Sequence, residues 1–284
     1  MNWYTYAGFA DEIDMDIRAQ IDGFKEIGMR YIELRGVNGK NISEISVEEA
    51  REIKKLMENE GFGVSAIGSP VGKTEVSAPN TPEVEKLRHI IRLAEIFETR
   101  YVRVFSPFLP EEDAPEKHRD TVMRRMQEYV DAARGTNVLL LHENEGGYIY
   151  GQAPENCRDI VETIGSAQLK VIFDPGNFVY AGFDALEAYH ILKPYIEHVH
   201  IKDSAGKDSV VPAGNGKVQY VEILRELKKL DRHFFLTHEP HLADCAALAA
   251  VDNNSFEKME GTPTELFRLA YKNFEKIMCR AEAL

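Results

Sequence analysis

The stretch Val138–Gly147, which reads VLLLHENEGG, decides the fold of this chain. Four apolar residues that suit a buried strand run directly into His142, Glu143, Asn144 and Glu145, and two glycines end the segment. A strand that is buried on both faces of a parallel sheet reads as a continuous apolar run. Functional side chains of α/β barrels gather where such strands end, so we expect the carboxylate of Glu143 at the mouth of a core.

Three later segments end in the same way. VIFDPGN carries Asp174, HVHIKD carries His200 and FFLTHEP carries Glu239. Together with Glu143 they supply three carboxylates and one imidazole, a ligand set that suits a hard divalent cation better than a thiolate-seeking metal. We therefore predict one divalent metal ion, with Mn2+ favoured and Mg2+, Co2+ or Zn2+ as alternatives. Its expected ligands are Glu143, Asp174, His200 and Glu239.

Strand-like and helix-like segments alternate along the chain. Ser46 with Glu49 three residues later, and Thr81 followed by Pro82, are typical of helix starts. Strict alternation implies parallel strands that are joined by crossover helices. The expected strands cover residues 3–9, 31–34, 64–67, 101–105, 138–141, 171–173, 198–201 and 234–237.

Eight strand–helix units in 284 residues match a closed (β/α)8 TIM barrel. The alternative, an open doubly wound sheet, would normally carry a nucleotide-binding fingerprint after its first strand, and Gly8-Phe9-Ala10 is not one. Because no linker or low-complexity segment interrupts the pattern, we expect residues 1–284 to form a single barrel domain. The one long loop, 242–261, directly follows Glu239 and is a candidate lid or binding element.

Composition limits the partners of the protein. The chain carries 34 Lys+Arg against 47 Asp+Glu, a formal net charge of −13. This balance argues against a general affinity for nucleic acid or an anionic membrane, although it leaves room for a local basic pocket that binds one phosphate. The cysteines at 157, 245 and 279 are few and far apart, which favours free thiols in a reducing compartment. With no signal-peptide pattern and no apolar run near the ~20 residues of a membrane span, we expect a cytoplasmic protein.

The motifs at the strand ends resemble a known family. They are similar to those of the xylose isomerase-like TIM barrels, specifically the sugar phosphate isomerase/epimerase branch that includes D-tagatose 3-epimerase. Six motifs, spread over nearly the whole chain, carry the resemblance: IELRG around Glu33, SAIGSPVGK around Lys73, HENEGG around Glu143, FDPGN around Asp174, HVHIKD around His200 and HEPH around Glu239.

The resemblance implies that the four predicted ligands hold the family's metal ion, and that Glu143 and Glu239 are also its two acid/base glutamates. The chain departs from the family at Asn177, where related enzymes often carry His. It also lacks a clear match for the epimerases' substrate-binding Arg after the seventh strand, which Lys202 or Lys207 could replace. The related apurinic endonucleases need that His and several others for three zinc ions, so their activity is not expected here.

Several other polar residues near the strand ends have two interpretations. Arg35, Lys73 and Arg103 could hold hydroxyls or a phosphate of a substrate, or form salt bridges with the acidic rim. Glu145 could face the pocket or solvent. The loop AGNGK (213–217) lies near the phosphate-binding position of many barrels, although a Gly-rich turn alone does not make a site. The candidate substrate-binding residues are Asn177, Lys202, Arg35, Lys73 and Glu145.

Three histidines lie beside or below the predicted ligands. His142 and His238 each neighbour a ligand in the sequence, so alternation along a strand should direct them away from the barrel axis. His198 shares a face with His200 but lies one layer deeper, where a hydrogen-bonded core residue is expected.

The predicted function is a metal-dependent isomerase or 3-epimerase that acts on a ketose or its phosphate through an enediolate. Glu143 and Glu239, at the ends of the fifth and eighth strands, would act on opposite faces of one carbon. A lyase or dehydratase acting on a cyclic polyol or keto acid would start with the same base and metal, and a barrel that binds a sugar without turnover is a third alternative. The expected partner is thus a small sugar or sugar phosphate; the oligomeric state is open, with a homo-oligomer among the options.

Overall fold

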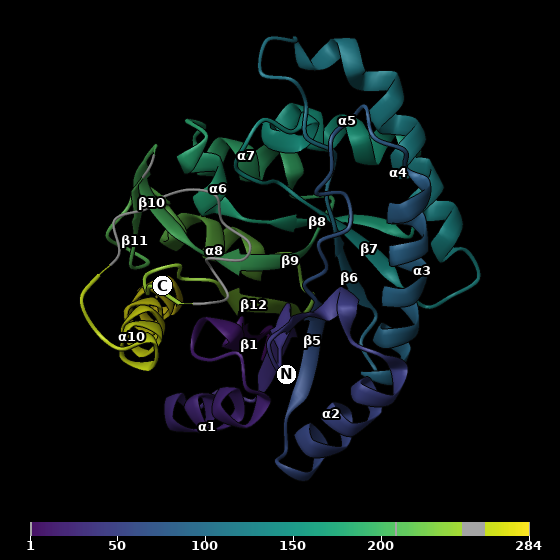
Figure 1. Ribbon diagram of the computed structural model, residues 1–284. Coiled ribbons are helices and arrows are strands. Elements are labelled where there is room, and N and C mark those ends of the chain that lie inside the picture. Colours follow the sequence, from purple (N-terminus) through teal and green to yellow (C-terminus); the bar gives the residue numbers. More distant parts are fainter. Residues whose placement is uncertain (1, 208, 246–258, 284) are drawn as a thin grey trace.

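The computed structural model describes residues 2–207, 209–245 and 259–283. Parallel strands close a barrel in the order β1-β12-β9-β8-β7-β6-β5-β2, and helices surround it (Figure 1). The predicted (β/α)8 architecture is therefore confirmed. The barrel strands are β1 (Tyr4–Gly8), β2 (Tyr31–Leu34), β5 (Gly63–Ile67), β6 (Tyr101–Val104), β7 (Leu139–Glu143), β8 (Leu169–Phe173), β9 (Ile196–Ile201) and β12 (Phe234–His238).

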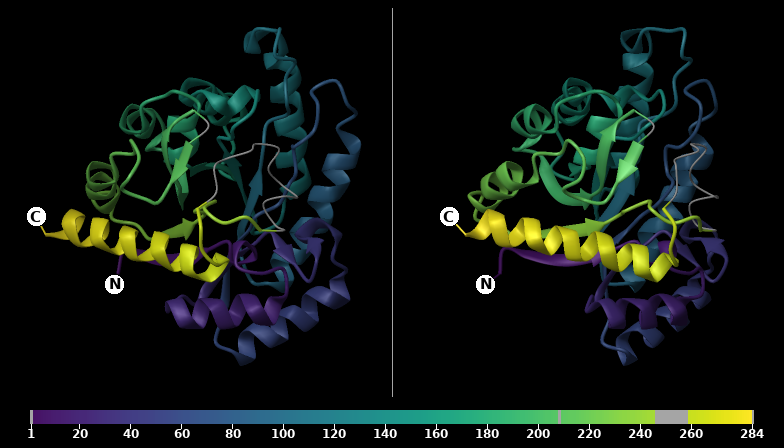
Figure 2. Two further views of the ribbon diagram at one scale, coloured as in Figure 1. Left: turned by 60° about the vertical axis from the view of Figure 1, so that its left-hand side comes forward. Right: turned by 90° about the vertical axis from the view of Figure 1, so that its left-hand side faces the viewer.

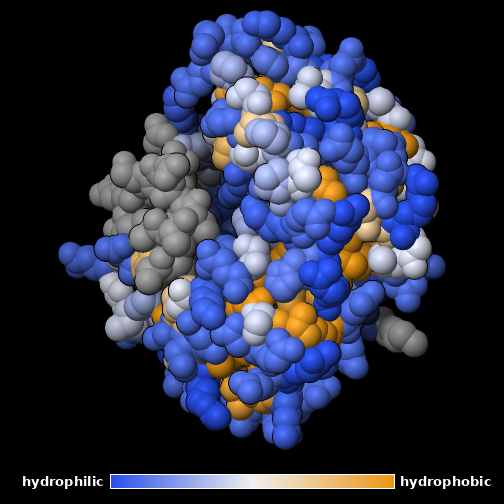
Figure 3. All heavy atoms as spheres, turned by 45° about the vertical axis from the view of Figure 1, so that its right-hand side comes forward, coloured by the Kyte–Doolittle hydropathy of each residue, from blue (hydrophilic) through white to orange (hydrophobic). Residues whose placement is uncertain are grey.

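The helices bury one apolar face against the barrel. On the third helix, for example, Leu87, Ile91 and Ala94 recur at helical spacing and are buried. Hydrophilic residues cover most of the molecular face in Figure 3. The helices are α1 (Ile17–Ile27), α2 (Val47–Asn59), α3 (Thr81–Ile96), α4 (Arg119–Ala133), α5 (Pro154–Ile164), α6 (Pro175–Tyr180), α7 (Ala185–Leu192), α8 (Tyr220–Lys228) and α10 (Pro263–Glu282).

Local sequence signals account for the helix starts. Ser46 and Glu49 form the predicted capping box of α2, in which each side chain satisfies a backbone N–H of the first turn. The α3 helix begins at Thr81, with Asn80 as its N-cap and Pro82 in its first turn. The last helix, α10, lies alongside the barrel in both views of Figure 2 and packs against α8 and α1. Among the described helices, none has both the length and the apolar composition needed to cross a membrane.

The structure contains short elements at the carboxyl ends of three strands that the sequence analysis did not predict. A short hairpin, β3 (Gly36–Val37) with β4 (Lys40–Asn41), follows β2, and a second, β10 (Asp203–Gly206) with β11 (Ser209–Val211), follows β9. The one-and-a-half-turn helix α6 begins directly after β8. These insertions build the rim of the barrel at the end where its functional side chains are expected. The loop predicted as a lid, 242–261, lies largely outside the described residues and stays a prediction.

Candidate metal centre

Four polar side chains meet at the carboxyl ends of four neighbouring barrel strands. Glu143 ends β7, Asp174 directly follows β8, His200 lies in β9 and Glu239 directly follows β12. One ligand atom from each residue lies within 4.8 Å of the others, and all four residues are buried. The structure thus brings together the four residues that the strand-end pattern singles out.

Contacts within this cluster fit a cation. His200 Nδ1 lies 2.6 Å from Glu143 Oε1 and 3.6 Å from Glu239 Oε2. Asp174 Oδ1 accepts the backbone N–H of Asn177 at 2.9 Å, as the N-cap of α6. Within the described part of the chain, Asp174 Oδ2 and Glu239 Oε2 are buried and accept no well-oriented hydrogen bond, although Lys202 Nζ lies 3.4 and 2.9 Å from them. Buried carboxylate oxygens that accept no well-oriented hydrogen bond are suited to coordinate a metal ion.

The electrostatics of the cluster agree with its geometry. Burial raises the pKa of Asp174 to about 7; repulsion from Glu239 and Glu143 adds to the shift, and Lys202 opposes it. Burial also disfavours the charged form of Glu239, but Lys202, His241 and His200 outweigh it and hold the pKa of Glu239 well below its usual range. Three carboxylates packed this closely gain from a divalent cation, which removes their mutual repulsion. The donor set therefore fits the predicted ion.

Two buried arginines each hold one glutamate of the cluster. Arg103 Nη1 donates to Glu143 Oε2 at 3.0 Å, and Arg35 Nη1 donates to Glu239 Oε1 at 2.8 Å. Arg35 also donates hydrogen bonds from Nε and Nη2 to the carboxylate of Asp11, at 2.8 and 3.0 Å. Both guanidinium groups lie against the ring of Phe9, 4.4 Å (Arg35) and 5.3 Å (Arg103) from its centroid. Both arginines therefore form salt bridges, one of the two interpretations open to them, and both also line the adjoining cavity.

A cavity adjoins the cluster and receives the candidate substrate-binding side chains. Glu145 faces this cavity and forms an ion pair with Lys73, with Nζ and Oε2 2.7 Å apart. Lys73 Nζ also lies 4.7 Å from the centroid of the Phe105 ring. The cavity is lined by the predicted residues Arg35, Lys73, Glu145, Asn177 and Lys202, by Arg103 and Glu239, and by residues that the sequence did not single out: Gly146, Gly176, Tyr180, Ser204, Val210 and His241.

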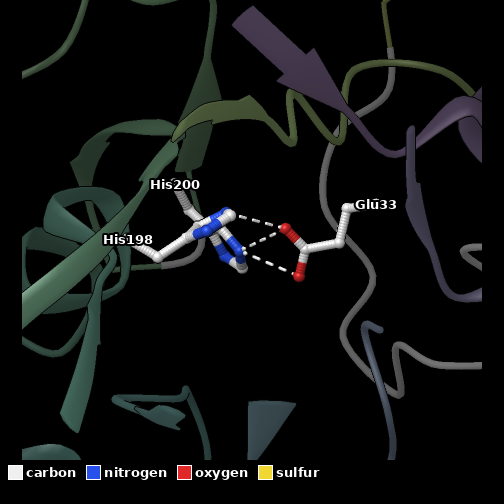
Figure 4. Close-up of side chains that lie close together, drawn as sticks. All are labelled: Glu33, His198 and His200. Carbon is white, nitrogen blue, oxygen red and sulfur yellow. Dashed lines mark hydrogen bonds and ion pairs between the residues drawn. The ribbon is translucent and has the colours of Figure 1, made fainter. Parts of the chain in front are cut away.

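A second layer of polar side chains lies beneath the cluster. Both His198 and His200 direct Nε2 toward the carboxylate of Glu33 (Figure 4), at 3.0 Å and 3.3 Å from its Oε2. His198 Nε2 also lies 2.7 Å from the hydroxyl of Thr237. The pairing of β2 with β5 shifts by one residue between Ile32 and Glu33, a bulge of the kind that redirects a side chain. His200 is therefore held at Nε2 while its Nδ1 faces the four-residue cluster.

Comparison with known proteins agrees with this architecture. The family model described as xylose isomerase-like TIM barrel matches residues 21–255. The chain belongs to this family. Its xylose isomerase-like barrel is 22% identical over 227 residues to a 3-dehydroshikimate dehydratase of Bacillus anthracis, covering 74% of this chain and 80% of the relative.

Solved structures of the same xylose isomerase-like fold include enzymes and a metal complex. A D-allulose 3-epimerase from Methylomonas sp. in complex with D-allulose superimposes with a TM-score of 0.75 at 13% identity, covering 96% of each chain. A xylose isomerase-like TIM barrel protein from Mycobacterium smegmatis in complex with magnesium superimposes with a TM-score of 0.71 at 17% identity, covering 99% of this chain and 97% of the other. At these identities the structures establish the shared fold.

The remaining histidine predictions are confirmed in this xylose isomerase-like barrel. His142 packs outward against Gly151, where an added Cβ would lie 2.2 Å from its ring. His238 packs among aromatic rings, with centroids 5.4 Å (Tyr271) and 5.3 Å (Phe274) away. His198 is the hydrogen-bonded core residue expected one layer below His200. In contrast, no role was predicted for Glu33, although a carboxylate between the apolar residues Ile32 and Leu34 of a short strand was a signal for one.

Replacing Glu33 with glutamine should weaken the binding of Mn2+ by roughly 10–100-fold, the usual cost of losing a carboxylate that orients a metal-bound histidine. The amide loses the charge that favours a proton on Nε2 of His200 and a lone pair on Nδ1. Titration of the protein with Mn2+, followed by the electron paramagnetic resonance signal of the free ion, measures the affinity. Glu48→Gln, which alters an exposed glutamate, is the matched control. Equal affinity for Mn2+ in the two variants would show that Glu33 does not support the metal site and has a structural role only.

Proposed function

We propose that this protein is a divalent-metal-dependent ketose isomerase or 3-epimerase in which Glu143 and Glu239 are the acid/base pair. One observation carries the proposal: each glutamate has one oxygen held by its own arginine and the other beside the shared cluster. Arg103 holds Oε2 of Glu143, which leaves Oε1 beside His200, and Arg35 holds Oε1 of Glu239, which leaves Oε2 buried and without a well-oriented donor among the described residues.

The proposed ion is held by Glu143, Asp174, His200 and Glu239, and Mn2+ is the favoured metal. When bound, it would stabilise the negative charge that develops on adjacent oxygens of the substrate. The orientation of Asp174 is set by its role as the N-cap of α6, and that of His200 by its contact with Glu33. Fixed donors need no reorganisation when charge develops, which is what lowers the barrier.

The proton transfers belong to the two glutamates. One carboxylate removes the proton next to the carbonyl group and produces an enediolate, and the other returns a proton from the opposite face. β7 and β12 are separated by β8 and β9 in the barrel, which supports approach from two sides. A 1,2-isomerisation needs only one of these carboxylates, so the pair favours epimerisation. Asn177, Lys202, Lys73 and Glu145 line the cavity and are proposed to bind the substrate's hydroxyl groups.

Dehydration is the second candidate, because the similarity to a 3-dehydroshikimate dehydratase covers 74% of the chain. The first step would be the same: a carboxylate removes a proton next to a carbonyl group. The hydroxyl group on the neighbouring carbon would then leave as water after protonation by the second acid. The two reactions thus use the same residues. They differ in whether the substrate loses a neighbouring hydroxyl group as water or regains a proton.

A panel of ketoses and cyclic keto acids tests the proposal. The protein is stripped with a chelator, reloaded with Mn2+, Mg2+ or Co2+, and assayed in D2O with detection by mass spectrometry. An epimerase gives a product that carries one solvent deuteron at the inverted carbon, whereas a dehydratase gives a product lighter by one water. Product without solvent deuterium would indicate a hydride shift and overturn the two-glutamate mechanism. Full activity of the stripped protein would overturn the metal requirement.

A further inference from the structure

The loop that follows β9 contains a cradle of backbone N–H groups. Four of them point at the carboxylate of Asp203: those of Ser204 and Val218 donate to Oδ1 at 2.8 and 3.2 Å, and those of Gly214 and Gly216 donate to Oδ2 at 2.8 and 3.1 Å. Asp203 is only 1% exposed, so this carboxylate fills the cradle completely. The two glycines belong to the segment AGNGK (213–217), which the sequence placed near the phosphate-binding position.

The loop that contains this cradle lies where many barrels of this fold bind phosphate. β9 is the seventh barrel strand, and the loops after the seventh and eighth strands of (β/α)8 enzymes frequently form the phosphate site. Converging backbone N–H groups of such loops are what binds a phosphate there. The space is too tight for a second anion, because a Cβ at Gly216 would already lie 2.1 Å from Asp203 Oδ1. Here the chain's own carboxylate takes the place of the anion.

The cavity itself offers no substitute cradle among its described residues. Its four cationic side chains each lie beside a carboxylate: Arg35 is bound to Asp11 and Glu239, Arg103 to Glu143, Lys73 to Glu145 and Lys202 to Glu239. A phosphate dianion entering the cavity would have to displace one of these carboxylates and remain close to it. The repulsion between like charges brought together in this way disfavours binding of the phosphate.

We infer that the site takes an unphosphorylated substrate, and that Asp203 is the specificity-determining residue because it occupies the anion position of the fold. The inference rests on the proposed function and narrows its substrate class from a sugar or sugar phosphate to a free sugar or polyol-like ketone. Ser204 and Val210 of the β10–β11 hairpin line the cavity, so the filled cradle lies directly behind the cavity wall.

Two measurements test this inference, the first on the metal-loaded protein and the second on the chelator-treated protein, in which no bound ion can coordinate the phosphate. The first compares kcat/KM for a free ketose and for its 1- and 6-phosphates, and the free sugar should be favoured by roughly 100-fold or more. The second is isothermal titration with inorganic phosphate. The wild-type protein should bind no phosphate at millimolar concentrations, whereas Asp203→Gly, which removes the carboxylate and leaves the four N–H groups, should bind it.

Several outcomes would overturn the inference. One is a wild-type protein that binds inorganic phosphate, or that prefers a phosphorylated ketose. Another is a folded Asp203→Gly variant that binds no phosphate. Asp203 would then only stabilise the loop and would not determine specificity. If this variant fails to fold, the wild-type comparison between free and phosphorylated ketose decides alone. Absence of turnover with every ketose would instead contradict the proposed function, and phosphate binding by the two proteins would still decide the role of Asp203.

Discussion

Replacing Glu143 or Glu239 with glutamine should each lower turnover by roughly a thousandfold, the scale at which general acid–base catalysis contributes. The amide keeps the size of the side chain and can still accept a hydrogen bond from Arg103 or Arg35, but it cannot take up a proton. Because the two residues would act as a pair on one carbon, the double variant should be little worse than either single variant. Steady-state kinetics on the preferred ketose, with the metal content measured in parallel, checks this expectation.

The metal content separates catalysis from ligand loss, since both glutamates are also proposed ligands. At saturating Mn2+, each variant should bind the ion and remain slow. Glu48→Gln, at an exposed position, should behave as wild type. If one glutamine variant retains full turnover with bound metal, that glutamate is not a catalytic residue, and the reaction needs a single base.

Asp174→Ala should remove the divalent ion, with a loss of affinity of about a thousandfold or more, because a buried carboxylate ligand is lost from a site with only four protein ligands. Asp174 does two things: Oδ1 caps α6, and Oδ2 accepts no hydrogen bond from the described residues. The chain offers a matched control, since Asp184 caps α7 by accepting the N–H of Glu187 at 2.9 Å but belongs to no described metal-ligand group.

Isothermal titration with Mn2+ and thermal unfolding distinguish the two roles of Asp174. Both alanine variants should lose about 1 kcal/mol of unfolding free energy from the missing cap. Only Asp174→Ala should lose the ion. Wild-type affinity for Mn2+ in Asp174→Ala would remove this residue from the ligand set and leave it a helix cap.

The four candidate ligands could be predicted because each follows an apolar strand in the sequence. A barrel brings all its strand ends to one face, so a local pattern is sufficient to place Glu143, Asp174, His200 and Glu239 together. The orientation of their partners is a different problem. Arg35 and Glu239 are 204 residues apart, and Glu33 and His200 are 167 residues apart. Which carboxylate such an arginine or histidine meets depends on strand register, which the alternation pattern does not specify.

Asp203 shows the same limit more sharply. In the sequence it is one more acidic residue after a strand, and AGNGK is a Gly-rich turn near the phosphate-binding position of many barrels. Only the three-dimensional path of the loop turns the N–H groups of Gly214 and Gly216 toward Asp203. The short elements α6 and β10–β11 were missed for a related reason: they pack mainly against one another and against α7, and they have little periodicity of their own.

The barrel closes where β1 pairs with β12, and Asp11, Arg35 and Glu239 form one chain of contacts close to that seam. During synthesis, Asp11 and Arg35 emerge from the ribosome early and Glu239 emerges late. The proposed ligands Glu143, Asp174, His200 and Glu239 all lie in the second half of this sequence, so the proposed ion site cannot assemble before that half has emerged. Capture of the proposed ion would then be a late event that follows completion of the barrel.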